Sequence, residues 1–298
     1  MRIRNLWCGG WLFALGLLAP LEATELQPGL VLGDDRVWLM ADTGGVACVS
    51  VDDGRELWFT RDIALPVSVA DGQLLAVRDA ANAGLAYAWV DAKSGKRLAA
   101  GSVDLPDSVR ALIDERLGES FAIDTTASGF DWHYRRAEVR GTPPSEDESV
   151  AKRADAVEMR GAFEIDWAKR ALIEADVDAT KAPRRAVEIG TPNPTGPRTF
   201  RSQSDAFRLI SERQDGRYRW TISSAEGQTL GTISSDYSYR PFEVVAGRLL
   251  FVTPLAMRRG GTDVDLSMPS LVAYDLASGE RVWQRELRDT RYRGPYPP

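Results

Sequence analysis

Residues 271–283 read LVAYDLASGERVW, in which an alternating apolar stretch is followed by an aspartate and then by a glycine. Alternation with a period of two buries one face of a β-strand. The aspartate can cap a turn with its side chain, and the glycine supplies the positive φ that a tight connection needs. An aliphatic residue and a tryptophan then begin a second strand, so the stretch predicts a β-hairpin.

The same pattern recurs along the chain, which indicates an internal repeat. Residues 46–58 read VACVSVDDGRELW, residues 85–99 read LAYAWVDAKSGKRLA, and residues 220–231, WTISSAEGQTLG, are a weaker copy. The turn glycines of the four copies are Gly54, Gly95, Gly227 and Gly279. Their spacings are 41, 132 and 52 residues. Because 132 is three steps of 44, two further copies are expected near residues 139 and 183.

Two segments are candidates for these missing copies. Residues 130–139 (FDWHYRRAEV) alternate like a strand, and residues 163–177 (FEIDWAKRALIEADV) resemble a hairpin whose turn has lost its glycine. Residues 168–175 are good helix formers, so a helix is the alternative there, although the repeat period favours the hairpin. Six units of roughly 40–50 residues predict an all-β chain, a β-propeller of about six to eight four-stranded blades, some degenerate. The alternative is an irregular β-sandwich.

These hairpins resemble the repeat of the quinoprotein-type, or PQQ-like, β-propeller family, which runs aliphatic-x-Ala-x-Asp-x-x-x-Gly-x-x-aliphatic-Trp. Residues 272–283 follow it nearly throughout, residues 91–95 match with Ala99 in the tryptophan position, and Gly54 to Trp58 match after a shortened turn. The resemblance implies either a quinone-dependent dehydrogenase or a propeller without a cofactor, such as the outer-membrane assembly propeller, which binds protein partners. The repeat alone does not choose between the two kinds.

The residues of a quinone site are scarce in this sequence. The resemblance implies a calcium-type cluster of carboxylates with an amide, yet only two asparagines follow the N-terminal apolar stretch. The single histidine, His133, lies in strand-like sequence, and Asp263, Asp265 and Glu280 are interpreted as solvated acids rather than calcium ligands. We therefore expect no catalytic, cofactor-binding or metal-binding residue. The alternatives are a PQQ-dependent oxidoreductase-like protein and a propeller that binds a sugar or another small molecule.

Charge and the N-terminus indicate the compartment. The chain has 298 residues, 37 basic and 43 acidic, and a formal net charge of −6, which argues against a nucleic-acid partner. Arg2 and Arg4 precede 14 apolar residues at 6–19, a pattern typical of a secretory signal and too short to span a bilayer. We therefore interpret residues 1–23 as a signal peptide and residues 24–298 as one periplasmic or secreted domain.

Several residues on the repeat are expected in the core. Loss of the signal peptide leaves Cys48 alone, so no internal disulfide forms, and its apolar surroundings favour a buried, unreactive thiol. Tryptophans on the repeat strands are expected to pack between neighbouring blades. They are Trp58, Trp89, Trp220 and Trp283.

The loops are left as the candidate binding surface. Propellers bind through loops on one face of the disc, and insertions are expected near 142–155, 179–205 and 258–270. Arginine and tyrosine are enriched at interfaces. The expected partner-binding residues are Arg258, Arg259, Arg291, Tyr292, Arg293 and Tyr296. The sequence thus predicts a monomeric, non-catalytic scaffold that binds a protein in the cell envelope and has no transmembrane segment.

Overall fold

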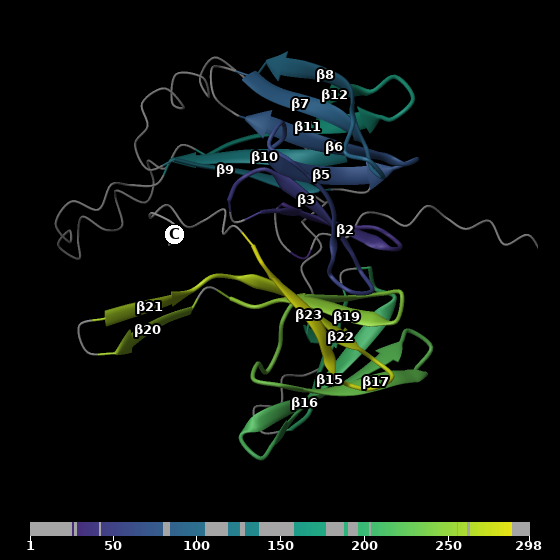
Figure 1. The fold of residues 1–298 in the computed structure, drawn as a ribbon, viewed down its shortest axis with the longest axis vertical. Helices are drawn as coiled ribbons and strands as arrows, with labels where there is room; N and C mark the ends of the chain where they lie inside the picture. The colour runs from purple at the N-terminus through teal and green to yellow at the C-terminus, as the bar shows by residue number, and fades with distance from the viewer. Residues whose placement is uncertain are drawn as a thin grey trace, which may run out of the picture.

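The computed structural model shows a chain built of β-strands, turns and irregular connections. The described residues are 26, 29–41, 43–79, 84–104, 119–125, 129–136, 158–176, 188–189, 196–202, 204–254, 256–260 and 263–287. Within them there are 23 strands and no helix. The predicted all-β class is therefore confirmed (Figure 1).

Five sheets follow one another along the chain, and each is an antiparallel meander. Sheet 1 contains β1 (Leu30–Leu32), β2 (Arg36–Met40), β3 (Val46–Ser50) and β4 (Glu56–Thr60). Sheet 2 contains β5 (Leu65–Ala70), β6 (Gln73–Asp79), β7 (Gly84–Asp91) and β8 (Arg97–Asp104). Sheet 3 contains β9 (Glu119–Thr125), β10 (Gly129–Arg136), β11 (Glu158–Asp166) and β12 (Ala171–Ala175).

The last two sheets carry additional strands. Sheet 4 contains β13 (Glu188–Ile189), β14 (Arg198–Arg201), β15 (Phe207–Gln214), β16 (Arg217–Ser224) and β17 (Thr229–Ser235). Sheet 5 contains β18 (Phe242–Val245), β19 (Arg248–Val252), β22 (Ser270–Asp275) and β23 (Arg281–Glu286). Between β19 and β22 the chain forms a separate hairpin of β20 (Ala256–Gly260) and β21 (Asp263–Ser267).

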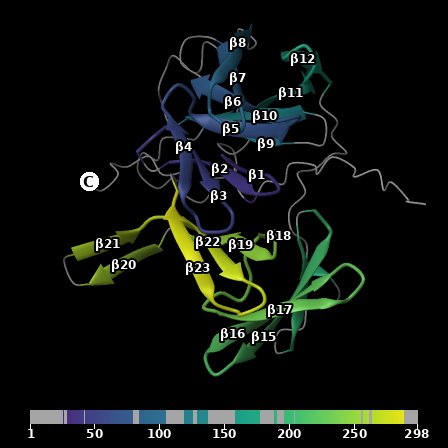
Figure 2. The same cartoon turned by 45° about the vertical axis from the view of Figure 1, so that its right-hand side comes forward.

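The sheets pack face to face in the spatial order 4, 5, 1, 2, 3. Buried side chains form four clusters, one between each pair of neighbours in this order. Between sheets 5 and 1, Leu39 and Val49 share a cluster with Leu250 and Trp283. Sheet 1 therefore lies between sheets 2 and 5 (Figures 1 and 2). A chain whose last sheet returns to pack on its first has the cyclic path that propellers use.

The repeat hairpin closes with the same hydrogen bond in sheets 1, 2 and 5. In sheets 2 and 5 the turn glycine N–H donates to the carbonyl of the aspartate four residues earlier, at 2.8 Å in both. In sheet 1 the same bond joins Gly54 N to Ser50 O at 2.9 Å. The expected shortened turn at Gly54 is therefore wrong, because the turn has full length and Ser50 occupies the aspartate position.

A β-bulge follows each turn glycine in sheets 1, 2, 4 and 5. At each bulge the pairing register skips the residue three positions after the glycine. The skipped residues are Leu57, Leu98, Leu230 and Val282. A bulge of this kind turns the outer strand and increases its local twist. The repeat in this chain is thus a hairpin with a fixed irregularity, and the weaker copy at Gly227 shares it.

The tryptophan of the repeat docks on the turn of the neighbouring sheet. Trp283 donates from Nε1 to Val51 O at 2.8 Å, and a Cβ added to Gly54 would lie 2.6 Å from its Cγ. Trp58 docks in the same way on sheet 2, where a Cβ at Gly95 would lie 2.8 Å from its Cδ2. The glycine is therefore required twice, by its positive φ and by the indole that lies against it.

Sheet 3 departs from the repeat. Residues 130–139 and 163–177, expected to belong to two separate units, contribute strands to this one sheet. The hairpin interpretation of 163–177 is confirmed and the helix alternative is wrong. Arg170 takes the glycine position with a φ of 54°, and no bulge interrupts the pairing of β11 with β12. The described residues form five such sheets, and the number of six to eight blades stays a prediction.

The interface between sheets 2 and 3 is filled differently from the others. Ala99 stands where a docking tryptophan would, and Trp167, from the turn of sheet 3, packs edge-on against Trp89 with ring centroids 5.0 Å apart. Arg170 Nε donates to Gln73 Oε1 of sheet 2 at 2.7 Å. At this interface the packing tryptophan, Trp167, therefore belongs to sheet 3 and not to the outer strand of sheet 2.

Other expectations about the chain have different outcomes. Cys48 is fully buried as a free thiol, as predicted, and burial raises its pKa to about 12. The signal peptide at 1–23 and the insertion at 142–155 lie outside the described residues. The expected insertion at 179–205 contains β13 and β14, which belong to sheet 4, whereas 258–270 falls largely in the β20–β21 hairpin.

Candidate functional site

Because each sheet is an antiparallel meander, successive connections between strands lie at alternate ends of the sheet. The outer-hairpin turns lie at one end, which we call the glycine-turn end, with Gly54, Gly95, Gly227 and Gly279. The connections from second to third strand, and from the outermost strand to the next sheet, leave at the opposite end, which we call the long-loop end. Trp283 and Trp58 dock on the glycine turns of the following sheets, so the ends of neighbouring sheets are aligned.

The long-loop end collects the segments that the sequence singled out. In sheet 3, β10 ends and β11 begins at this end; in sheet 5, β19 ends and β22 begins there. The equivalent connections of sheets 1 and 4, at 41–45 and 215–216, are short. The chain also leaves sheet 5 at this end after Leu287. Sequence alone places these segments far apart, and only the meander of each sheet brings them to one end.

The β20–β21 hairpin projects from the long-loop end, clear of the five sheets (Figures 1 and 2). Arg258 pairs with Asp265 in register and Arg259 is the next residue of β20. At the base, Thr253 N donates to Ser270 O and Ser270 N donates to Thr253 Oγ1, both at 2.9 Å. Two of the expected partner-binding residues therefore lie on a projecting element. The other four, Arg291, Tyr292, Arg293 and Tyr296, lie outside the described residues.

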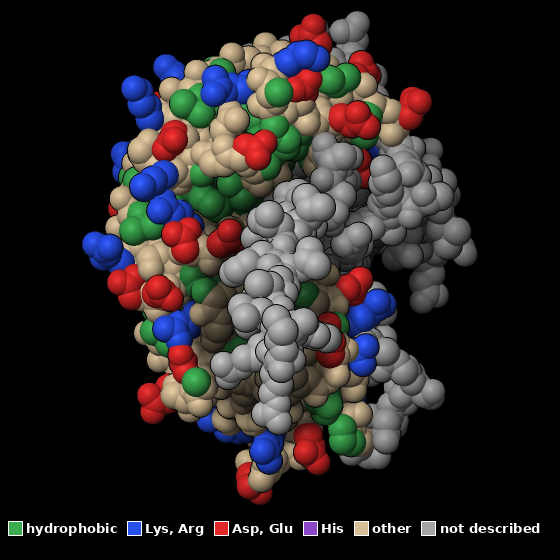
Figure 3. Space-filling model, turned by 90° about the vertical axis from the view of Figure 1, so that its right-hand side faces the viewer, with side chains coloured by type: hydrophobic (Ala, Val, Ile, Leu, Met, Phe, Trp, Pro, Cys, Tyr) green, Lys and Arg blue, Asp and Glu red, His purple; other side chains and the backbone are tan. Residues whose placement is uncertain are grey.

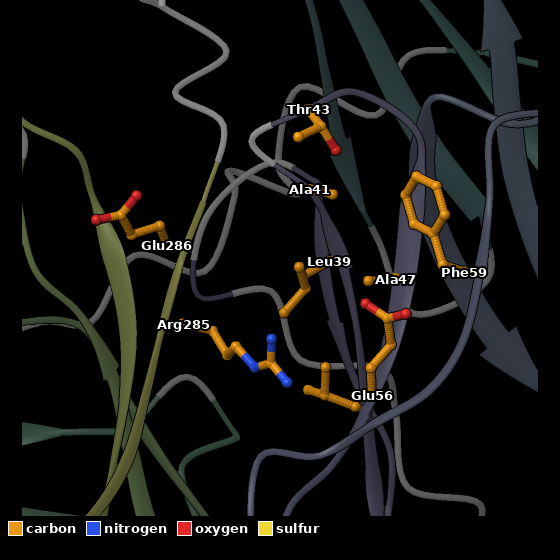
Figure 4. A pocket seen from close by; sticks show the side chains of 9 residues that line it. Leu39, Ala41, Thr43, Ala47, Glu56, Phe59, Arg285 and Glu286 are labelled. Carbon is orange, nitrogen blue, oxygen red and sulfur yellow. The ribbon is translucent and has the colours of Figure 1, made fainter. Parts of the chain in front are cut away.

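A cleft of about 180 Å³ lies between sheets 5 and 1 (Figure 4). Its lining residues are Leu39, Ala41, Thr43, Ala47, Val49, Glu56, Phe59, Arg285 and Glu286. Arg285 extends toward sheet 1 and donates from Nε to Gly54 O at 2.8 Å. Its lining combines apolar side chains with the charged side chains of Glu56, Arg285 and Glu286. Sequence reasoning missed it, because its walls come from opposite ends of the chain.

A cluster of aromatic residues and arginine fills the connection 236–241, which enters sheet 5 at its long-loop end. The guanidinium of Arg240 lies 4.6 Å from the ring centre of Tyr237. Tyr237 is held by Trp220, whose Nε1 donates to Tyr237 O at 2.9 Å. Burial lowers the pKa of Arg240. Its Nε is enclosed and has no hydrogen-bond partner.

Glu243, close to this cluster in sequence, is a buried carboxylate that is already occupied. Its Oε2 accepts from Ser204 N at 3.0 Å, and its Oε1 accepts from Ser204 Oγ at 2.9 Å and from Val244 N at 3.1 Å. Burial raises the pKa of this carboxyl, although the hydrogen bonds from Ser204 and Val244 oppose the shift. Glu243 therefore ties the β14–β15 connection of sheet 4 to sheet 5.

Neither a metal-binding cluster nor a membrane-spanning helix is found among the described residues. No group of three His, Cys, Asp or Glu side chains in this part of the chain is placed to hold a metal ion. His133 lies in β10, paired in register with Arg160. None of the described segments forms a helix long and apolar enough to cross a membrane. On the face drawn in Figure 3, acidic and basic side chains are interspersed rather than gathered by sign.

The comparisons with known proteins give weak likenesses. No protein-family model matches this sequence, and no curated protein sequence matches it. The structure of BamB from Moraxella catarrhalis is similar at 10% identity and a TM-score of 0.25, over 74% of this chain and 68% of that chain. The protein lmo1340 from Listeria monocytogenes EGD-e is similar at 10% identity and a TM-score of 0.30, over 88% and 81%.

One enzyme structure is also similar. The quinohemoprotein alcohol dehydrogenase ADHIIG from Pseudomonas putida HK5 is similar at 9% identity and a TM-score of 0.24, over 86% of this chain and 58% of that chain. The TM-scores of all three structures are low. The strand pairing and sheet packing of this chain therefore define its architecture.

Proposed function

We propose that this chain is an exported, non-catalytic propeller that binds a protein partner in the cell envelope through its long-loop end. The five described sheets are its blades. The observation that carries the proposal is the difference between the two ends. The glycine-turn end has tight turns in sheets 1, 2, 4 and 5, whereas the projecting β20–β21 hairpin lies at the long-loop end.

The hairpin is built in a way that suits binding rather than folding. β19 pairs with β22 directly, so sheet 5 is complete without β20 and β21. A two-stranded hairpin is marginally stable on its own in water. An element that adds nothing to its own sheet, projects from the molecule and carries Arg258 and Arg259 has the composition and place of a partner-binding ribbon.

Site-specific crosslinking in the native cell tests this proposal. A photo-reactive amino acid at position 259, on the hairpin, is expected to give one discrete adduct with another protein. The matched control is position 226, an exposed site in the turn of Gly227 at the glycine-turn end. A second probe at position 215, in the β15–β16 turn of the long-loop end, should also give an adduct with the partner. Replacing 256–267 by a short Gly-Ser linker should leave the unfolding transition intact and abolish this adduct. Equal labelling at 226 and 259 would contradict the proposal.

The absence of catalysis is tested separately. The purified chain, supplied with pyrroloquinoline quinone and calcium, is expected to show no thermal stabilisation and no dye-linked dehydrogenase activity on alcohols or sugars. Activity that follows quinone loading would overturn the non-catalytic part of the proposal. Export is tested by sequencing the N-terminus of the protein from the cell envelope, which should begin at Thr24.

A further inference from the structure

We infer that Arg240 binds an acidic side chain of a polypeptide partner; this inference rests on the proposed protein-binding function. Arg240 is half-buried, and among the described residues it has neither a hydrogen-bond acceptor nor an ion-pair partner. Other half-buried arginines have an acidic or carbonyl partner for at least one nitrogen, although Nε of Arg201 and Nε of Arg248 are also enclosed without an acceptor. Arg36 and Arg201 pair with aspartates, Arg248 pairs with Asp275, and Arg285 donates to Gly54 O. A partly desolvated cation that nothing neutralises is unfavourable in the free protein.

The described carboxylates closest to Arg240 in sequence already have partners. Glu243, the buried acid of β18, accepts hydrogen bonds on both oxygens from Ser204 and Val244. Asp236, four residues before Arg240, pairs with Arg217 at 2.8 Å. Among the described residues, no carboxylate pairs with Arg240, whereas Arg201 pairs with Asp205 at 3.2 Å. A guanidinium left without an internal partner in a well-paired neighbourhood is available to an external one.

The platform under Arg240 holds the guanidinium in a binding orientation. Its ring contact is Tyr237, which is fixed through Trp220 Nε1 and through its own N–H to Ser235 Oγ at 3.1 Å. Tyr239 stacks on Phe200 with ring centroids 4.0 Å apart, which fixes the other side of the connection. Because Nε of Arg240 is enclosed, the terminal N–H groups of the guanidinium are the donors left to match the two oxygens of a carboxylate.

The surroundings favour a carboxylate on a polypeptide over a phosphate. One guanidinium offers a single two-pronged contact, which a single carboxylate satisfies. A phosphate carries more charge and more acceptor oxygens, so its sites gather several cations or N–H donors. The aromatic residues beside Arg240 instead provide apolar contact area for the backbone and neighbouring side chains of a peptide. Arginine flanked by tyrosine is also the composition of energetic centres in protein interfaces.

Defined peptides test the inference on the full chain. The probes are a blocked tripeptide with aspartate between two leucines, the same peptide with asparagine, and inorganic phosphate. Binding is followed by the NMR shift of the backbone amide of Arg240 and its neighbours. The aspartate peptide is expected to bind roughly tenfold more tightly than the asparagine peptide, because a hydrogen bond to a charged group contributes more than a neutral one.

Matched variants assign the effect to one side chain. Arg240→Gln should remove the preference for aspartate over asparagine, whereas Arg201→Gln should retain it, because Arg201 already pairs with Asp205. Arg240→Lys keeps the charge without the planar fork and should retain only part of the preference. Equal affinity for the two peptides in the unchanged protein, or a preference that survives Arg240→Gln, would overturn the inference. Phosphate binding tighter than the aspartate peptide would overturn it in favour of a phosphate ligand.

A stability measurement separates this role from a structural one. Arg240→Met removes an unpaired, half-buried charge, so the melting temperature should be unchanged or raised. Substitution of a residue that serves function rather than folding often has this effect. A clearly lowered melting temperature would show that Arg240 holds the fold, and would count against the inference. The peptide titration needs no natural partner, so it can fail while crosslinks form at position 259, and the two proposals are distinguished.

Discussion

The interface between sheets 5 and 1 and the interface between sheets 2 and 3 join similar sheets in two different ways. In the first, Trp283 of the outer strand β23 docks on the glycine turn at Gly54 and donates to Val51 O. In the second, Ala99 replaces the tryptophan and Arg170 replaces the glycine. The large side chain comes from the other partner, because Trp167 of sheet 3 packs against Trp89 of sheet 2.

The difference shows that the features of the repeat are physically coupled. A docked indole excludes any side chain at the turn, so tryptophan on one sheet requires glycine on the next. Where the indole is missing, the turn is free to carry Arg170, with its φ of 54°. The bulge is absent in the same hairpin. At the interface of sheets 2 and 3, the missing tryptophan of one sheet and the missing glycine of the other thus occur together.

The largest effect is expected from Trp283→Ala. The substitution removes a ring that is 8% exposed and leaves Val51 O without its indole donor, so unfolding free energy should fall by about 3–5 kcal/mol. The matched variant Trp283→Phe keeps most of the apolar ring and loses the N–H, so it should cost clearly less. Denaturant unfolding monitored by circular dichroism measures both. A loss below about 1 kcal/mol for the alanine variant would mean that the dock contributes little.

The reactivity of Cys48 should report how firmly the docked interface of sheets 1 and 2 is closed. Cys48 pairs in register with Trp58, and burial raises its pKa to about 12. The Cys8→Ser background leaves Cys48 as the single thiol of the full chain. In it, Trp58→Ala should lower the free energy needed to open the interface by about 2.7 kcal/mol. Labelling of Cys48 by a disulfide reagent at pH 8 should therefore be about 100-fold faster.

The same thiol gives a pH dependence with a defined sign. Its folded pKa is raised above the unfolded value, so the thiol contributes stability below about pH 8.5. That contribution is lost as pH rises from there toward 12, because the unfolded thiol ionises first.

The matched control for the labelling experiment is Trp167→Ala, at the interface of sheets 2 and 3. This variant should leave the rate of Cys48 labelling nearly unchanged. Equal acceleration by both variants would mean that the two interfaces open together.

The hairpins could be predicted from sequence because they depend on local chemistry. The pairing of strands between units and the sites built from distant residues could not, because they depend on long-range packing. Alternation, Asp and Gly identified three outer hairpins, and Gly and Leu at matching positions identified the weak copy at Gly227. The division into units was wrong at one place, because β10 and the β11–β12 hairpin were interpreted as separate units although they belong to one sheet. Period and turn signals do not say which strands pair. The cleft and the Arg240 cluster were also missed, since residues far apart in sequence build the first and ordinary loop residues build the second.

A smaller effect is expected from substituting the turn glycines of sheet 2. Gly72 and Gly95 both have a φ of 71°, but a Cβ at Gly72 meets nothing within 4 Å, whereas one at Gly95 meets Trp58. Gly72→Ala should therefore cost about 1–2 kcal/mol from backbone strain alone. Gly95→Ala should cost at least about 1 kcal/mol more, from displacement of the indole. Equal losses in denaturant unfolding would show that the indole moves freely and does not enforce the glycine.

The smallest effect is expected from Arg170→Gly, which restores the glycine where no tryptophan docks. The change relieves a left-handed conformation that costs a non-glycine residue about 1 kcal/mol. It also removes the hydrogen bond to Gln73 Oε1 and adds unfolded-state freedom. These contributions oppose one another, so the unfolding free energy should change by less than about 1 kcal/mol. The variant Gln73→Ala isolates the hydrogen bond. If Arg170→Gly instead destabilises as strongly as Trp283→Ala, the arginine itself locks sheets 2 and 3 together, and the contrast between the two interfaces is one of chemistry and not of strength.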